Sequence, residues 1–151
     1  MLSDLDELYQ QVILDHGRKP RNFRAIEKPS ATAEGFNPLC GDRVTVCLTR
    51  DNGNIADAAF TGKGCAISTA SASMMTQAVK GKSLDELHSL FELFHHMVTD
   101  ESCTEDKLAP LGKLAVFAGV RKYPVRVKCA TLPWHTMLAA LEHKGGSVST
   151  E

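Results

Sequence analysis

The spacing of apolar residues predicts an N-terminal helix that begins after Ser3 and ends at Gly17-Arg18-Lys19. Its apolar positions follow the 3.6-residue period and are Leu5, Leu8, Tyr9, Val12 and Ile13. Serine is a favoured N-cap residue, and glycine followed by Pro20 marks the end of the helix. Residues 18–30 lack either period and are expected to form an irregular connection.

Alternation of apolar and polar residues predicts strands within residues 31–62. Val44, Val46 and Leu48 share one face of a strand, and the residues between them share the other face. The turn Asp51-Asn52-Gly53-Asn54 favours a hairpin with an antiparallel return over residues 55–61. A third strand is expected before Phe36. Such a small sheet needs helices on one face.

Helical periodicity dominates the remainder of the chain. Residues 66–79 predict a helix rich in small side chains, and Ser83-Leu84-Asp85-Glu86 forms a capping box that opens the next helix. A third helix is expected over residues 104–119, interrupted or restarted at Pro110, and a last one over about residues 130–144. The pattern therefore predicts an α+β fold, a small three-stranded antiparallel sheet with helices packed on it. We expect a single domain over residues 1–151 with a flexible tail at 145–151.

Charge and composition narrow the classes of function. The 151 residues carry 17 Lys and Arg against 18 Asp and Glu, for a net charge of −1. That balance argues against nucleic acid as a partner, because phosphate binding calls for a basic excess. No apolar run approaches the roughly 18 residues of a membrane span, and the acidic N-terminus does not resemble a secretory signal. We expect a cytoplasmic protein that has no membrane partner.

Three of the five cysteines occupy special positions in the predicted elements. Cys40 precedes Gly41-Asp42 in the turn before a strand, and Cys65 lies between a strand end and a helix start. Cys129 is expected to open the last helix, where the helix dipole favours a thiolate. Three thiolates and the Asp42 carboxylate form a reasonable ligand set for Zn²⁺ or for the iron of an iron–sulfur cluster.

The cysteines also admit an inert interpretation. Free cysteine is often a small buried hydrophobe, and the spacing contains no paired Cys-x-x-Cys motif. We favour this interpretation for Cys47, within a predicted strand, and for Cys103, within an acidic loop. Signatures of zinc proteases, zinc deaminases and serine hydrolases are absent from the sequence.

Three sequence blocks resemble the iron–sulfur cluster assembly scaffold family, which includes IscU, the N-terminal domain of NifU, and SufU. The blocks are residues 37–42, 62–73 and 126–134, and they occur in the family's order. Within the family the chain resembles the SufU branch most. It lacks the Pro-Pro-Val-Lys stretch of IscU proteins, and Lys128 stands where IscU proteins have a histidine. The segment between Cys65 and Cys129 is also longer, as in SufU.

The resemblance implies a SufE/NifU-like fold and a specific chemistry. Cys40, Asp42, Cys65 and Cys129 match the family's metal ligands, Cys40 matches the sulfur acceptor, and Arg126 matches a residue that assists partner docking. The implied function is a zinc-bound acceptor of persulfide sulfur from a SufS-type cysteine desulfurase, a sulfurtransferase-like partner rather than a free-standing enzyme. The implied recipients are apo iron–sulfur proteins or a downstream Suf scaffold.

Two other functions stay open. One is a scaffold that assembles a transient iron or [2Fe–2S] centre on the same ligands and passes it to apo-proteins. The other is a protein with a purely structural zinc.

Overall fold

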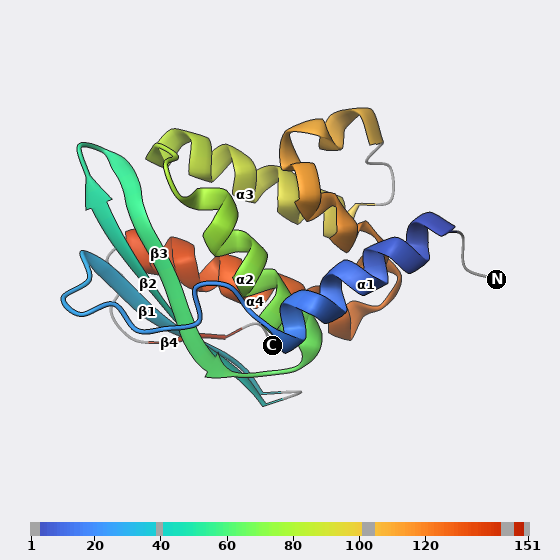
Figure 1. Cartoon of the computed structure of the whole chain (residues 1–151), viewed down its shortest axis with the longest axis horizontal. Coiled ribbons are helices and arrows are strands. Elements are labelled where there is room, and N and C mark those ends of the chain that lie inside the picture. The colour runs from blue at the N-terminus through green and yellow to red at the C-terminus, as the bar shows by residue number, and fades with distance from the viewer. Residues whose placement is uncertain (1–3, 39–40, 101–104, 143–146, 150–151) are drawn as a thin grey trace.

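The protein is a twisted sheet with helices gathered on one face (Figure 1). A computed structural model describes residues 4–38, 41–100, 105–142 and 147–149. The elements follow the order α1 (Asp4–Arg18), β1 (Ala31–Asn37), β2 (Asp42–Asp51), β3 (Asn54–Lys63), α2 (Ala66–Val79), α3 (Leu84–Thr99), η1 (Glu105–Lys122), α4 (Pro124–Leu141) and β4 (Ser147–Ser149). None of the helices within these ranges combines the length and the hydropathy needed to cross a bilayer.

The predicted three-stranded antiparallel sheet is confirmed. β1 pairs with β2 and β2 pairs with β3, both antiparallel, with Val46 opposite Ala33 on one side and opposite Phe60 on the other. The hairpin turn places Asn52 and Gly53 at φ 53° and 82°, a region that asparagine and glycine tolerate better than other residues.

A fourth strand adds to the edge of this sheet. β4 runs parallel to β1, which gives the strand order β3-β2-β1-β4. These three residues lie within the tail, residues 145–151, whose flexibility stays a prediction. Without β4, the edge of β1 would offer unpaired backbone N–H and C=O groups, and a short segment of almost any sequence can pair with such groups.

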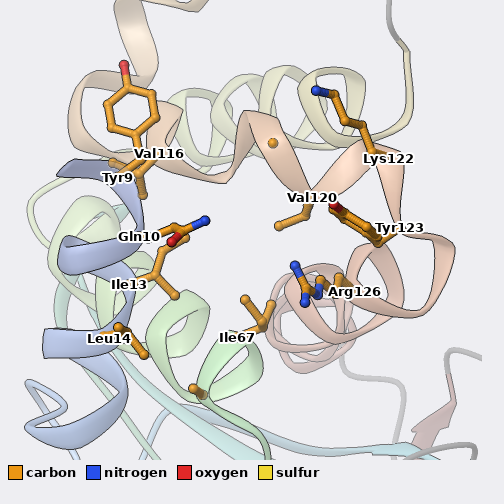
Figure 2. Close-up of a pocket in the computed structure, with 12 residues that line it drawn as sticks. Tyr9, Gln10, Ile13, Leu14, Ile67, Val116, Val120, Lys122, Tyr123 and Arg126 are labelled. Atoms are coloured by element: carbon orange, nitrogen blue, oxygen red, sulfur yellow. The ribbon is translucent and has the colours of Figure 1, made fainter. Parts of the chain in front are cut away.

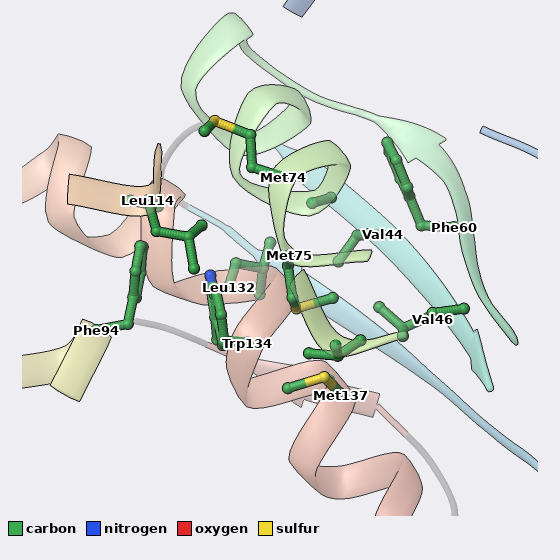
Figure 3. Close-up of a cluster of buried hydrophobic side chains, with 14 of the residues drawn as sticks. Val44, Val46, Phe60, Met74, Met75, Phe94, Leu114, Leu132, Trp134 and Met137 are labelled. Atoms are coloured by element: carbon green, nitrogen blue, oxygen red, sulfur yellow. The ribbon is translucent and has the colours of Figure 1, made fainter. Parts of the chain in front are cut away.

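The core lies between the sheet and the helices (Figure 3). α4 packs on β1 and β2, and α2 packs on β3 and α4. Fully buried Trp134 stacks on Phe94 of α3 with ring centroids 4.5 Å apart. The indole Nε1 donates to Ser71 Oγ at 3.2 Å, and Ser71 Oγ donates to the carbonyl of Ala130 at 2.5 Å, so α2 and α4 are bonded through one hydroxyl.

Two helix boundaries differ from the predictions. α4 begins at Pro124 instead of near residue 130, because proline at the first helical position has its φ already set and needs no N–H partner. Cys129 therefore lies in the second turn of α4 and not at its N-terminus. The break within η1 lies at Gly112, with φ 55°, and not at Pro110.

The α3 capping box is present as predicted. Ser83 Oγ accepts from the backbone of Glu86 at 3.2 Å, and the Glu86 carboxylate accepts from the backbone of Ser83 at 3.1 Å.

Candidate metal centre

Three side chains from distant parts of the chain meet at one end of the sheet. Asp42 is the first residue of β2, Cys65 is the N-cap of α2, and Cys129 lies in α4. One ligand atom of each, a carboxylate oxygen and two sulfurs, lies within 4.8 Å of the others. The fold thus brings together three of the four residues predicted as ligands.

Asp42 fixes the position of Cys65 through two contacts. The carboxylate oxygen Oδ1 accepts from the backbone N–H of Cys65 at 2.9 Å, and Oδ2 accepts from its thiol at 3.6 Å. Asp42 is only 2% exposed, so the carboxylate is largely shielded from water. Cys65 Sγ in turn accepts from the backbone of Ser68 at 3.4 Å, which satisfies an N–H group of the first turn of α2.

Glycines allow the chain to pass this close to Asp42. Gly62 has φ 144°, and a Cβ atom there would lie 2.1 Å from the carbonyl oxygen of Arg43. A Cβ atom on Gly64 would lie 3.1 Å from Asp42 Oδ1. The Gly-Lys-Gly stretch before Cys65 therefore has a structural reason: it lets β3 lead into α2 while the Cys65 backbone reaches the carboxylate.

The environment favours a thiolate at Cys65. A hydrogen bond from the Cys129 thiol is the main influence that lowers the pKa of Cys65 to about 7, and backbone N–H groups at Ser68 and Ile67 act in the same direction. Burial and the negative charge of Asp42 oppose this shift. The thiolate is the form that binds metals and attacks sulfur, so a substantial fraction is ready near neutral pH.

The distance between Cys65 and Asp42 fits a tetrahedral zinc site. With Zn–S near 2.3 Å and Zn–O near 2.1 Å, a sulfur and an oxygen ligand are about 3.6 Å apart and two sulfurs about 3.8 Å. The observed separation of Cys65 Sγ and Asp42 Oδ2 is 3.6 Å. Thiolate ligands also suit iron–sulfur clusters, so the donor set alone fits both groups.

The fourth predicted ligand, Cys40, lies outside the described residues. Its segment connects the ends of β1 and β2, where Asn37 and Asp42 are paired across the sheet. Gly41 has φ 75°, and its N–H donates to the carbonyl of Asn37 at 2.8 Å.

Comparison with known proteins identifies the family. The sequence matches the NifU-like N terminal domain over residues 8–130, a range that includes Asp42, Cys65 and Cys129. The chain belongs to this family. One relative is the zinc-dependent sulfurtransferase SufU of Bacillus subtilis. It is 42% identical over 135 residues, which cover 89% of this chain and 90% of the relative.

Other relatives are named as scaffold proteins of iron–sulfur cluster assembly. The iron–sulfur cluster assembly scaffold protein IscU of Streptococcus pyogenes is 39% identical over 97% of this chain and 90% of its own. A solved structure of a putative scaffold protein for the SUF system from Fervidobacterium islandicum is 35% identical, with a TM-score of 0.80 over 89% of this chain and 97% of that one. The N-terminal NifU-like protein of Brucella abortus is 26% identical, with a TM-score of 0.81 over 93% and 96%. The predicted family and fold are therefore confirmed.

Arg126 is not among the three donors that converge. It is exposed in the first turn of α4, one turn before Cys129, and its guanidinium lies 4.4 Å from the centre of the Tyr123 ring. Lys128 is half-buried on the same helix.

Cys47 lies in the middle of β2, away from the group of donors. Its sulfur is 3.6 Å from Thr32 Oγ1, and its side chain points to the face of the sheet opposite Val46. Cys103 lies outside the described residues. Nothing in the described contacts links Cys47 to Asp42, Cys65 or Cys129.

We expect Cys47→Ser and Cys103→Ser to keep the metal content of the wild-type chain. Serine preserves the size of the side chain and, at position 47, still has Thr32 as a hydrogen-bond partner. Metal analysis of the purified variants by mass spectrometry checks this expectation. Loss of metal from either variant would show that the ligand set includes a residue other than those proposed.

Proposed function

We propose that this chain accepts sulfur from the persulfide of a SufS-type cysteine desulfurase, with Cys40 as acceptor and with Cys40, Asp42, Cys65 and Cys129 as ligands of Zn²⁺. The convergence of Asp42, Cys65 and Cys129 within 4.8 Å supports this proposal most strongly. The name of the B. subtilis relative, a zinc-dependent sulfurtransferase, favours zinc and sulfur transfer over the alternatives.

The transfer step is a thiol exchange. The Cys40 thiolate attacks the outer sulfur of the desulfurase persulfide, a new S–S bond forms on Cys40, and the S–S bond within the donor breaks. The desulfurase cysteine leaves as a thiolate, and the outer sulfur keeps its proton. The sulfur atom moves from the desulfurase cysteine to Cys40, and the step needs no external oxidant or reductant.

The neighbouring residues prepare this step. Asp42 holds the Cys65 backbone, and Cys129 stabilises the Cys65 thiolate through a hydrogen bond. Bound Zn²⁺ would supply positive charge that keeps the ligand cysteines deprotonated. A thiolate held by Zn²⁺ would be a weak nucleophile, so a ligand supplied by the desulfurase would free Cys40 to act as the acceptor.

The proposal also names partners. Exposed Arg126 at the rim of the centre would contact the desulfurase, and apo iron–sulfur proteins or a downstream Suf scaffold would receive the sulfur. We place the protein in the cytoplasm, where cysteine thiols stay reduced. On this proposal it acts as a sulfurtransferase-like partner of the desulfurase.

A second candidate function uses the same ligands. The chain would assemble a transient [2Fe–2S] cluster as cargo and transfer it to apo-proteins. The scaffold names of the S. pyogenes and F. islandicum relatives favour it, and three sulfurs with one carboxylate suit iron as well as zinc. The lysine at position 128, where IscU proteins have a histidine, favours the sulfur acceptor.

Metal analysis combined with a desulfurase assay tests the proposal. We expect a colourless protein that contains stoichiometric zinc, raises desulfurase turnover, and gains the mass of one sulfur atom on Cys40. The Cys40→Ser variant should not gain that mass, and Cys47→Ser serves as the matched control. A brown protein that absorbs visible light and leaves desulfurase turnover unchanged would contradict the sulfur acceptor and favour the scaffold.

A further inference from the structure

A groove of about 390 Å³ opens between α1, the N-terminal end of α2, the end of η1 and the start of α4 (Figure 2). Its walls include Ile13 and Leu14 of α1, Ile67 of α2, and Val120 of η1. Figure 2 shows the side chains of Ile13, Ile67 and Arg126 directed into the space between the helices. The metal centre uses none of these residues as a ligand.

Two of the helices that line the groove, α2 and α4, also position cysteines of the metal centre. Ala66 and Ile67, which line it, directly follow Cys65. Arg126, which also lines it, lies one turn before Cys129 on α4. A molecule seated in the groove would therefore contact the same helix turns that carry Cys65 and Cys129.

The lining selects for an acidic and partly apolar occupant. Lys122 and Arg126 contribute positive charge, and none of the described side chains that line the groove is acidic. Leu14 is 45% exposed and Tyr123 is 50% exposed, an unusual degree of exposure for large apolar side chains. The Tyr123 ring also supports the Arg126 guanidinium at 4.4 Å, which holds the cation at the rim.

We propose that this groove docks an extended, acidic segment of the sulfur-donating desulfurase, with an apolar side chain of that segment against Leu14 and Ile67. This inference rests on the proposed function. It adds an anchoring surface beyond Arg126, formed by α1 and η1. Docking there would orient the donor so that its persulfide arrives at the edge of the cluster, and charge complementarity would speed the encounter.

Substitutions of opposite charge at Leu14 test the groove. Leu14→Glu and Leu14→Lys remove the same apolar contact, but only glutamate repels an acidic segment. We expect Leu14→Glu to raise the concentration of this protein that half-saturates desulfurase stimulation by about tenfold or more, and Leu14→Lys to raise it much less. Lys122→Glu should act like Leu14→Glu, while Lys107→Glu, at an exposed position in the first part of η1, should match the wild type.

Three further measurements distinguish the outcomes. Zinc content and melting temperature show whether each variant keeps its fold and its centre, and sedimentation of the chain alone shows whether the groove joins two copies. Wild-type half-saturation in both Leu14→Glu and Lys122→Glu would overturn the docking proposal and leave the proposed function intact. A change in self-association without a change in half-saturation would assign the groove to a second copy and overturn it too. A wild-type chain that neither binds nor stimulates the desulfurase would overturn the proposed function itself, and the docking inference with it.

Discussion

Replacing Asp42 by alanine is expected to remove most of the bound zinc and most of the sulfur acceptance by Cys40. The carboxylate is one of the three donors that converge, and it also accepts the backbone N–H of Cys65. Alanine leaves that N–H without its acceptor and opens a coordination position to water. Both losses weaken the same centre, so we expect metal affinity to fall by a factor of about ten or more.

The Asp42→Asn variant separates the two roles of the carboxylate. Asparagine keeps an oxygen that can accept from the Cys65 backbone, but it lacks the negative charge and binds metal poorly. If Asp42 is a ligand, both variants should lose zinc. If Asp42 only holds the backbone of Cys65 in place, the Asp42→Asn variant should behave like the wild type. Zinc content, desulfurase turnover and cluster lifetime after anaerobic reconstitution are the measurements, with Cys47→Ser as control.

The Asp42→Ala variant discriminates between the two candidate functions. In a sulfur acceptor the main effect should fall on desulfurase turnover, because the metal that positions Cys40 is disturbed. In a scaffold the main effect should be slower release of the cluster, because the exchangeable ligand is gone. Wild-type zinc content, turnover and cluster lifetime together in Asp42→Ala would rule out Asp42 as a ligand.

Local sequence signals predicted the sheet well, because hairpin turns and strand alternation act between near neighbours. The Asn52-Gly53 turn and the alternation around Val46 are sufficient to define β2 and β3. The start of α4 was harder to predict. Val125 and Val127 alternate with Arg126 and Lys128, a pattern typical of a strand, whereas in the structure these residues form the first turns of the helix that begins at Pro124.

The assembly of the centre depends on contacts that no local pattern encodes. The sequence indicated Cys65 and Cys129 as candidates, but their separation in space is set by how α2 packs on α4. Ser71 bonds to both Ala130 and Trp134 at that contact, and in the sequence it is one of several similar serines in a helix rich in small residues. The close approach of Gly64 to Asp42 likewise becomes visible only in the fold.

Removal of the metal is expected to lower the melting temperature without unfolding the protein at room temperature. A ligand that binds only the folded chain stabilises it by about 4 kcal/mol when its free concentration is a thousand times its dissociation constant. For a chain of this length that corresponds to roughly 8–16 °C. The apo-protein should stay folded because most of its core, which includes Trp134 and Phe94, is built from side chains that are not proposed ligands.

The metal-dependent gain in stability should also depend on pH, in a direction set by Cys65. The pKa of Cys65 in the folded chain, about 7, lies below the usual thiol value of about 8.5. The thiolate of the folded chain is therefore present above pH 7 and is lost as the pH falls through 7. Protons then compete with zinc for the same sulfur. Melting curves with and without a chelator should differ strongly at pH 8 and little at pH 5.5. Equal melting temperatures at pH 8, after metal loss is verified by mass spectrometry, would show that the centre contributes nothing to the stability of the fold.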